Sequence, residues 1–197
     1  MWQPVTDVRP AVHTFDTAPG SPTTREGAAT VNAEHLKGRA IVTLSDAAKI
    51  GAVDDILFDG EYRQVLGFTL RHGPFGTTEA VSRDRVSTVG QDALTVTGPD
   101  AVNSLDRLTA LTGASSLSQA QQTQVVTESG TLLGAISQVE LDDEARTVLS
   151  YTLSTSLWKR MRHNAPRIEV QDVLRFGSAG IMIVADRVGA RLASEAE

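Results

Sequence analysis

An internal repeat is the strongest constraint on how this chain folds. Residues 50–70, IGAVDDILFDGEYRQVLGFTL, align without a gap with residues 133–153, LGAISQVELDDEARTVLSYTL, and nine of the 21 positions are identical. A repeat of this kind predicts two copies of one structural unit. A chain of 197 residues has room for two domains of about 80 residues, and each would bury only a modest core unless the two packed together.

The repeat extends on both sides of this window once four residues are inserted into the second copy. The flanking matches are AIVTLSDAAKIG (40–51) with TQVVTESGTLLG (123–134), VSRDRV (81–86) with IEVQDV (168–173), and DALTV (92–96) with GIMIV (180–184). Each copy therefore has the order strand, turn, strand, hairpin, strand, short strand, turn, strand.

The hydrophobic pattern within each copy indicates strands. Leu66, Phe68 and Leu70 alternate with the other residues of VLGFTL, which is the period of two of a strand with one buried face. Short strands at close spacing predict a small antiparallel barrel. The predicted fold is mainly β, with two tandem small antiparallel β-barrels, each followed by a short helix.

The two helices are expected where each copy ends. In residues 100–113, four apolar residues stand three apart, Asp100 is a candidate N-cap, and Gly113 is a candidate C-terminal stop. Residues 186–197 also begin with Asp. The predicted domains are residues 34–113 with a linker helix and residues 114–197 with a C-terminal helix.

Residues 1–33 differ in composition from the rest. They hold four of the seven prolines and a run rich in Ser, Thr and Gly, which predicts a flexible N-terminal tail. Trp2 and Phe15 leave open whether this tail docks on the folded part or on a partner.

Composition narrows the chemistry. The chain has no cysteine, which excludes thiol catalysis, disulfides and cysteine-based metal sites. The net charge of −6 argues against binding a polyanion over the whole surface, although a local basic patch stays possible. We find neither a signal peptide nor an apolar run of the ~18 residues that a membrane span needs, so we expect a cytoplasmic protein without a membrane partner.

The combined pattern resembles the PRC-barrel family. It consists of KIGAVDDILFD (49–59), VLGFTLRHG (65–73), AVSRDRV (80–86) and DALTV (92–96), and the second copy repeats it in more divergent form. The resemblance implies small β-barrels of the kind found in the H subunit of photosynthetic reaction centres and in the ribosome maturation factor. In that family the barrel acts mainly as a docking or assembly module.

Three aspartates in one apolar stretch, Asp54, Asp55 and Asp59, are the candidate metal ligands. The second copy keeps only the last of them, and hard cations need six or more oxygens. The alternative is structural: a β-bulge at Asp54–Asp55 and at Ser137–Gln138 restores the alternation of the apolar residues.

The third aspartate has a structural interpretation of its own. With a bulge at Asp54–Asp55, Asp59 falls at the turn of the hairpin. Glutamate and arginine two residues apart follow in both copies and are expected to pair across the turn; they are Glu61 with Arg63 and Glu144 with Arg146.

Other catalytic signatures are missing from the sequence. There is no GxSxG elbow and no phosphate-binding glycine loop. The four histidines are scattered, with a pair formed by His72 and His163 as the remaining possibility. We therefore expect no cofactor and no enzymatic activity, with a hydrolase as the remote alternative.

The loops after the central hairpins differ most between the copies. Residues 154–167 gather basic residues around a tryptophan, whereas residues 71–80 are short and glycine-rich with Phe75 at the tip. The candidate partner-binding residues are Trp158, Lys159, Arg160, Arg162, Arg167 and Phe75. Such a loop suits a protein partner, self-association, RNA or lipid, or it simply covers the end of the barrel.

The sequence thus favours a non-catalytic cytoplasmic adaptor or assembly factor that docks a protein partner and can form a homo-oligomer. The first alternative is an accessory factor linked to RNA or the ribosome. The second is an accessory protein of photosynthetic or membrane electron transport, like the reaction-centre H subunit.

Overall fold

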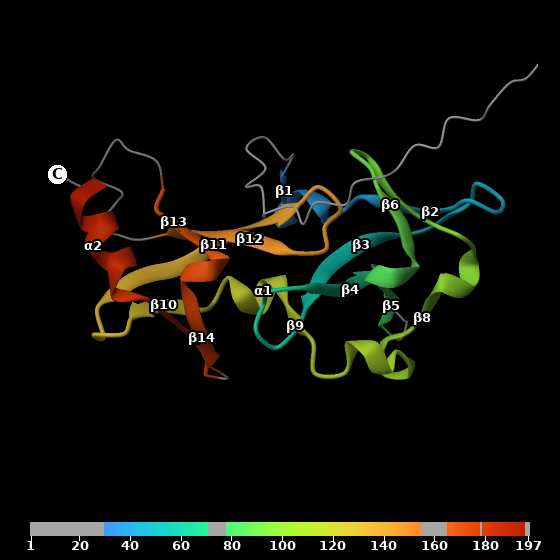
Figure 1. Cartoon of the computed structure of the whole chain (residues 1–197). Coiled ribbons are helices and arrows are strands. Elements are labelled where there is room, and N and C mark those ends of the chain that lie inside the picture. Colours follow the sequence, from blue (N-terminus) through green and yellow to red (C-terminus); the bar gives the residue numbers. More distant parts are fainter. Residues whose placement is uncertain (1–29, 71–77, 155–164, 178, 196–197) are drawn as a thin grey trace, which may run out of the picture.

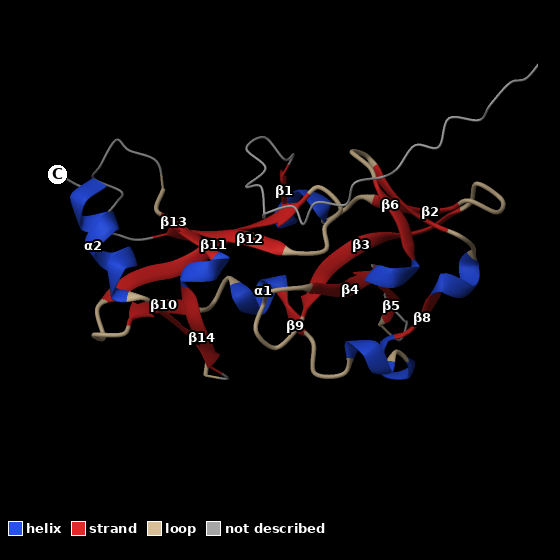
Figure 2. Ribbon diagram, in the orientation of Figure 1, coloured by secondary structure: helices blue, strands red, loops and turns tan. Residues whose placement is uncertain are grey.

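The computed structural model describes residues 30–70, 78–154, 165–177 and 179–195. The fold is mainly β, as predicted, and its strands form two curled sheets that lie side by side (Figures 1 and 2). Each sheet corresponds to one copy of the repeat, and most neighbouring strands are antiparallel.

The first sheet has the strand order β6-β7-β2-β3-β4-β5-β8, with β9 paired to β3. Its strands are β2 (Ala40–Thr43), β3 (Lys49–Phe58), β4 (Val65–Leu70), β5 (Glu79–Ser82), β6 (Val86–Val89), β7 (Ala93–Val96), β8 (Val102–Ser104) and β9 (Ser115–Ser116). The 3-10 helix η2 (Arg83–Arg85) joins β5 to β6.

The second sheet has the order β13-β12-β11-β10-β15-β14, with β1 paired to β11. Its strands are β1 (Thr30–Asn32), β10 (Gln124–Thr127), β11 (Leu132–Asp142), β12 (Val148–Ser154), β13 (Arg167–Glu169), β14 (Val173–Gly177) and β15 (Ile181–Val184). The 3-10 helix η7 (Val170–Asp172) joins β13 to β14.

Strand pairing makes the two copies equivalent and corrects their alignment at one place. Each copy has one parallel pair, β2 with β7 and β10 with β15. Thr43 pairs with Val96 and Thr127 pairs with Val184, so AIVT matches QVVT at an offset of 84 residues. The turn before β11 is therefore one residue shorter than the turn before β3.

The copies exchange their first strands. β1 precedes the first sheet in the chain but pairs with β11, and β9 precedes the second sheet but pairs with β3 (Figure 1). The short helices that follow are also exchanged, because η1 (Ala33–Leu36) contacts β11 and α1 (Leu117–Ala120) contacts β3. Residues 30–33, predicted to belong to the tail, are thus part of this exchange.

One continuous core joins the copies. Buried apolar side chains of both sheets form a single cluster, which includes Phe58 and Phe68 from the first copy and Tyr151 and Leu153 from the second. The Tyr151 hydroxyl donates to the carbonyl oxygen of Tyr62 across the seam at 2.6 Å. The two sheets therefore stabilise each other through packing as well as through strand exchange.

The predicted linker helix over residues 100–113 is wrong. This segment contains β8 and three 3-10 turns, η3 (Pro99–Ala101), η4 (Leu105–Arg107) and η5 (Thr109–Leu111). Apolar residues three apart match the three residues per turn of a 3-10 helix rather than the 3.6 of an α-helix. Leu105, Leu108 and Leu111 lie over the outer face of the first sheet, with Leu57 and Ala80.

The predicted C-terminal helix is present as α2 (Asp186–Glu195). Val188 and Leu192 are buried in the common core. Arg187 donates to the buried carboxylate of Asp172 from Nε at 3.0 Å and from Nη2 at 2.6 Å. Arg191 Nη2 donates to the carbonyl oxygen of Arg167 in the edge strand β13 at 2.9 Å, so α2 covers part of an edge that β8 covers in the first copy.

Candidate functional site

The paired aspartates lie at a β-bulge, as the alternation of apolar residues predicted. The register of β3 against β4 shifts between Val53 and Asp55, which leaves Asp54 as the extra residue. The register of β11 against β12 shifts at the equivalent place, between Ile136 and Gln138. Bulges at the same position in both copies explain why the sequence is polar there.

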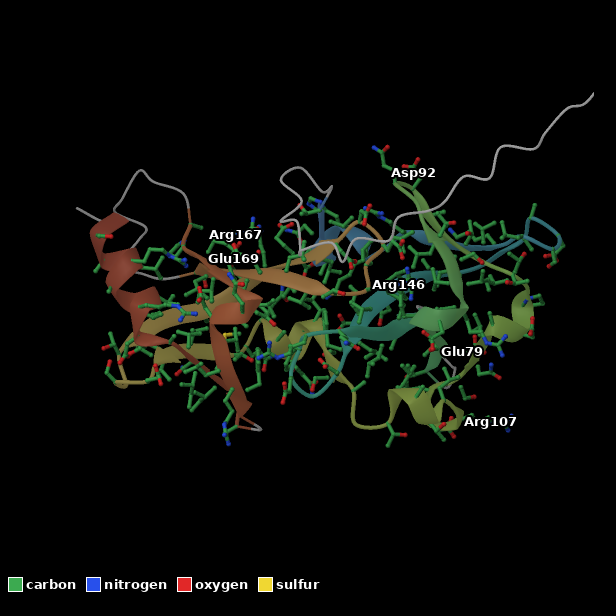
Figure 3. All side chains as sticks on the ribbon, viewed as in Figure 1. Glu79, Asp92, Arg107, Arg146, Arg167 and Glu169 are labelled. Carbon is green, nitrogen blue, oxygen red and sulfur yellow. The ribbon has the colours of Figure 1, made fainter. Side chains whose placement is uncertain are left out.

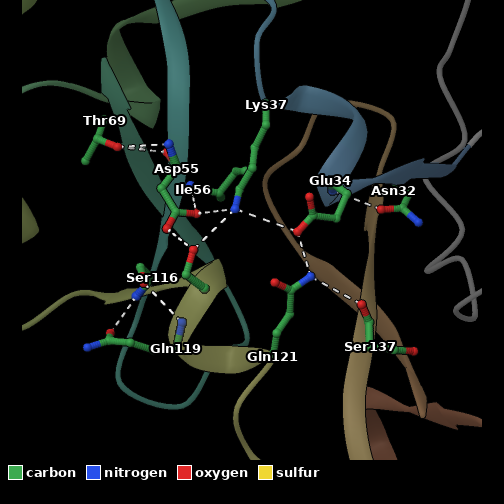
Figure 4. Close-up of polar contacts among 11 residues, drawn as sticks. Asn32, Glu34, Lys37, Asp55, Ile56, Thr69, Ser116, Gln119, Gln121 and Ser137 are labelled. Atoms are coloured by element: carbon green, nitrogen blue, oxygen red, sulfur yellow. Dashed lines mark hydrogen bonds and ion pairs between the residues drawn. The ribbon is translucent and has the colours of Figure 1, made fainter. Parts of the chain in front are cut away.

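Asp55 belongs to a polar network on the seam between the copies (Figure 4). Its carboxylate accepts from the Ser118 hydroxyl at 2.8 Å and lies 3.3 Å from Lys37 Nζ. The network continues on the side of the second copy, where the amide of Gln121 donates to Glu34 at 2.6 Å and to the Ser137 carbonyl at 3.2 Å. The carboxylate of Asp55 therefore has a structural role, because it connects β3 to Ser118 in α1 and to Lys37, which follows η1.

Asp59 closes the hairpin, as predicted. Its Oδ1 accepts from the backbone N–H of Arg63 at 2.7 Å and of Gln64 at 3.2 Å, and Asp142 accepts from Arg146 N–H at 2.6 Å in the second copy. An aspartate that accepts from main-chain donors in this way fixes a tight turn.

The predicted Glu–Arg pairs across the two turns are both formed. Arg63 Nε lies 3.1 Å from Glu61, and Arg146 Nε lies 2.7 Å from Glu144. The hydrogen bond and the charge of Arg146 lower the pKa of Glu144 below its usual value. Within the described ranges, no group of three or more His, Cys, Asp and Glu side chains is arranged to hold a metal ion.

Each hairpin is joined to the other copy by one arginine. Arg63 donates from Nη2 to the Val173 carbonyl at 2.9 Å. Arg83 is 4% exposed and donates to the Glu144 carbonyl and, at 3.2 Å, to the Ala145 carbonyl. Burial lowers the pKa of this guanidinium. Both arginines satisfy backbone carbonyls at the seam and so act in assembly of the two copies.

The predicted partner-binding loop falls largely outside the described residues. Of its candidates, Trp158, Lys159, Arg160, Arg162 and Phe75 are not described, and Arg167 lies in β13. Arg167 Nε donates to Glu169 at 3.2 Å, and both side chains are labelled on the second copy in Figure 3. That these residues form one partner-binding surface therefore stays a prediction.

A surface that the sequence analysis missed lies on β14 and β15 of the second copy. Leu174 is 49% exposed and Ile181 is 41% exposed, and their equivalents in the first copy are Ser87 and Ala93. We call the surface formed by Leu174, Arg175, Ile181 and Ile183 the β14–β15 face. A comparison of VLRF with VSTV, the matching residues of β14 and β6, would have revealed it from the sequence.

A pocket of 590 Å³ lies on the seam, and we call it the seam pocket. It is lined by Gly60, Tyr62, Ser115, Gln119, Gln122, Thr123, Phe176, Gly177, Ala179 and Gly180. None of these lining residues is charged, and the rings of Tyr62 and Phe176 are in contact with centroids 4.6 Å apart. Its volume is in the range of small-molecule and side-chain binding sites, which often lie between domains.

Comparison with known proteins finds one family match, in the first copy. Residues 30–102 match the family model of the PRC-barrel domain, whereas no curated protein matches the chain. No helix in the described part of the chain is long and apolar enough to cross a membrane. The second copy repeats the strand order and the exchanged strand of the first, although the family model does not extend to it. The chain therefore contains a PRC-barrel domain at residues 30–102.

Proposed function

We propose that this protein is a non-catalytic adaptor or assembly factor that binds a protein partner through its second copy. The observation that carries the proposal is the β14–β15 face, where exposed Leu174 and Ile181 replace Ser87 and Ala93 of the first copy. Exposed apolar residues beside an arginine are typical of a protein-binding surface.

The roles of the ionisable groups support a binding function over an enzymatic one. Asp55, Asp59, Arg63, Arg83 and Asp172 each hold a turn, a strand or a helix in place through hydrogen bonds to the surrounding chain. These contacts account for the most conspicuous charged groups of the described residues without a reaction. We also propose that the protein acts in the cytoplasm, and cell fractionation tests this localisation.

Affinity capture from the native cell tests the proposal with a matched pair of variants. We expect a stoichiometric protein partner that is bound by the wild type and lost from Leu174→Ser. Leu44→Ser is the control, because Leu44 is 61% exposed on the first copy and lies outside the β14–β15 face. Retention of every partner by Leu174→Ser would refute this assignment of the binding surface.

Two further arms of the same capture separate the alternatives. A partner set that disappears after RNase would support the accessory role linked to RNA or the ribosome. Binding of the purified protein to anionic vesicles would support the membrane-associated role instead. Light scattering of the purified protein reports whether two protein molecules associate into a homodimer.

A further inference from the structure

The two copies differ in what occupies one groove at the seam. In the second copy this groove is the seam pocket, with Thr123 in its wall. In the first copy the equivalent position carries Arg39. Two pairs of backbone bonds establish the equivalence: Arg39 N–H donates to Leu36 and its carbonyl accepts from Val53, and Thr123 makes the matching bonds to Ala120 and Ile136.

The side chain of Arg39 spans the groove of the first copy. Its Nε donates to the His35 carbonyl at 2.8 Å and its Nη1 donates to the Gly90 carbonyl at 2.6 Å. By strand register and helix position, the counterparts of His35 and Gly90 are Gln119 and Gly177, and both line the seam pocket. The short side chain of Thr123 therefore leaves open, in the second copy, the path that a guanidinium follows in the first.

We propose that the seam pocket binds the guanidinium group of an arginine side chain from the partner protein. This inference rests on the proposed docking function and gives the partner a chemistry. The first copy shows that carbonyl oxygens can hold a guanidinium at this place, because Arg39 donates to the carbonyls of His35 and Gly90.

The seam pocket adds groups that suit the same guest. Tyr62 of the first hairpin and Phe176 of β14 line the pocket, whereas the groove around Arg39 has Ala145 of the second hairpin and Val89 of β6 at the equivalent positions. An aromatic side chain attracts a guanidinium through its ring face. The Gln122 amide and the Ser115 hydroxyl line the pocket and make no side-chain hydrogen bond to another described residue, whereas the side-chain oxygen of Gln119 accepts from Ser116 N–H. The Gln122 and Ser115 side chains are acceptors available to a guest.

The net charge of the chain, rather than a charged group in the pocket, favours a cation over an anion. The described lining residues carry neither a basic nor an acidic side chain, so hydrogen-bond acceptors hold the guest there. The chain has a net charge of −6, which raises the local concentration of cationic partners. A planar cation that donates several hydrogen bonds fits the lining better than the compact ammonium of lysine.

Binding of N-acetyl-arginine amide, followed by NMR shifts of the full-length protein, tests the proposal. We expect saturable binding with shifts centred on Gln122 and Gly177, and weaker binding of the lysine and citrulline analogues. Thr123→Arg should abolish binding, because its own guanidinium would fill the pocket as Arg39 fills the groove of the first copy. Phe176→Leu, which keeps an apolar residue, should weaken binding about tenfold by removing a ring face.

The outcomes separate this inference from the proposed function. Equal binding of the arginine and citrulline analogues, or shifts elsewhere on the surface, would overturn the guanidinium assignment. A Thr123→Arg protein that stays folded and still captures the partner would show that docking uses the β14–β15 face without the pocket. If Thr123→Arg does not fold, the analogue series on the wild type and on Phe176→Leu still decides.

Discussion

The two copies share a strand order but differ in how completely each is covered by its own chain. In the first copy the linker packs three leucines over the outer face of the sheet, and Arg39 spans the groove at the seam. In the second copy the equivalent outer positions are polar, with Glu140 in place of Leu57 and Arg167 in place of Ala80. At these two places the first copy is covered by its own chain, whereas the second copy leaves the equivalent places open to another molecule.

The largest expected effect comes from giving the first copy a residue of the second. Gly67 is the equivalent of Ser150, and a Cβ at Gly67 would lie 2.5 Å from the Val81 carbonyl and 3.0 Å from Leu111. Because a backbone atom blocks the space, we expect Gly67→Ser to destabilise the protein by about 3 kcal/mol or more. Chemical denaturation measures this. Ser150→Gly is the control and should cost about 1 kcal/mol or less.

A smaller loss is expected for the hydrogen bond that crosses the seam. Tyr151→Phe removes the donor to the Tyr62 carbonyl and should lower the free energy of unfolding by about 1 to 2 kcal/mol. A change in stability below a few tenths of a kcal/mol would mean that the carbonyl finds another donor.

The same substitution should change alkaline stability. Burial raises the pKa of Tyr151 above its ordinary 10.0, so its contribution is complete below pH 10 and declines as the pH rises toward the folded-state value. We expect the wild type to lose stability above pH 10 more steeply than Tyr151→Phe. Thermal unfolding at a series of pH values is the measurement.

A gain is expected at the one fully buried side-chain polar atom among the described residues that lacks a hydrogen bond, the hydroxyl of Ser150. Ser150→Ala should stabilise the protein by about 1 kcal/mol, because it removes an unsatisfied hydroxyl. A loss of stability would show that the hydroxyl has a partner in solution.

The smallest effect is expected at the start of α2. The backbone N–H of Ser129 donates to Asp186 at 2.9 Å and lowers the pKa of this carboxyl below its usual value. Its contribution is therefore present above the ordinary pKa and is lost as the pH falls through the folded-state pKa. Asp186→Asn should flatten the acid limb of the stability profile slightly and leave neutral stability nearly unchanged, as measured by acid titration with circular dichroism.

The features predicted correctly from the sequence are those that local pattern determines. The bulge at Asp54 followed from a break in the alternation of apolar residues, and the turn at Asp59 followed from a short acidic segment repeated in both copies. The helix predicted over residues 100–113 failed because a spacing of three was assigned to an α-helix, although three residues per turn is the 3-10 period.

The features missed depend on contacts between distant parts of the chain. The exchanged strands β1 and β9 are three and two residues long, and such short segments carry no periodicity that identifies their partners. The difference between the seam pocket and the groove filled by Arg39 becomes visible only when Thr123 is matched with Arg39, which requires the one-residue shift in alignment that strand pairing reveals. The basic loop around Trp158 lies outside the described residues and stays a prediction.

The strand exchange changes the meaning of the domain boundary near residue 113. Each copy lends its first strand to the other, so a chain cut in the linker would give two fragments that each lack a strand of their own sheet. The unit that is repeated in the sequence is therefore not a unit that folds by itself. The linker keeps each repeat at a high effective concentration for the other. Separated halves would have to associate with each other to complete their sheets.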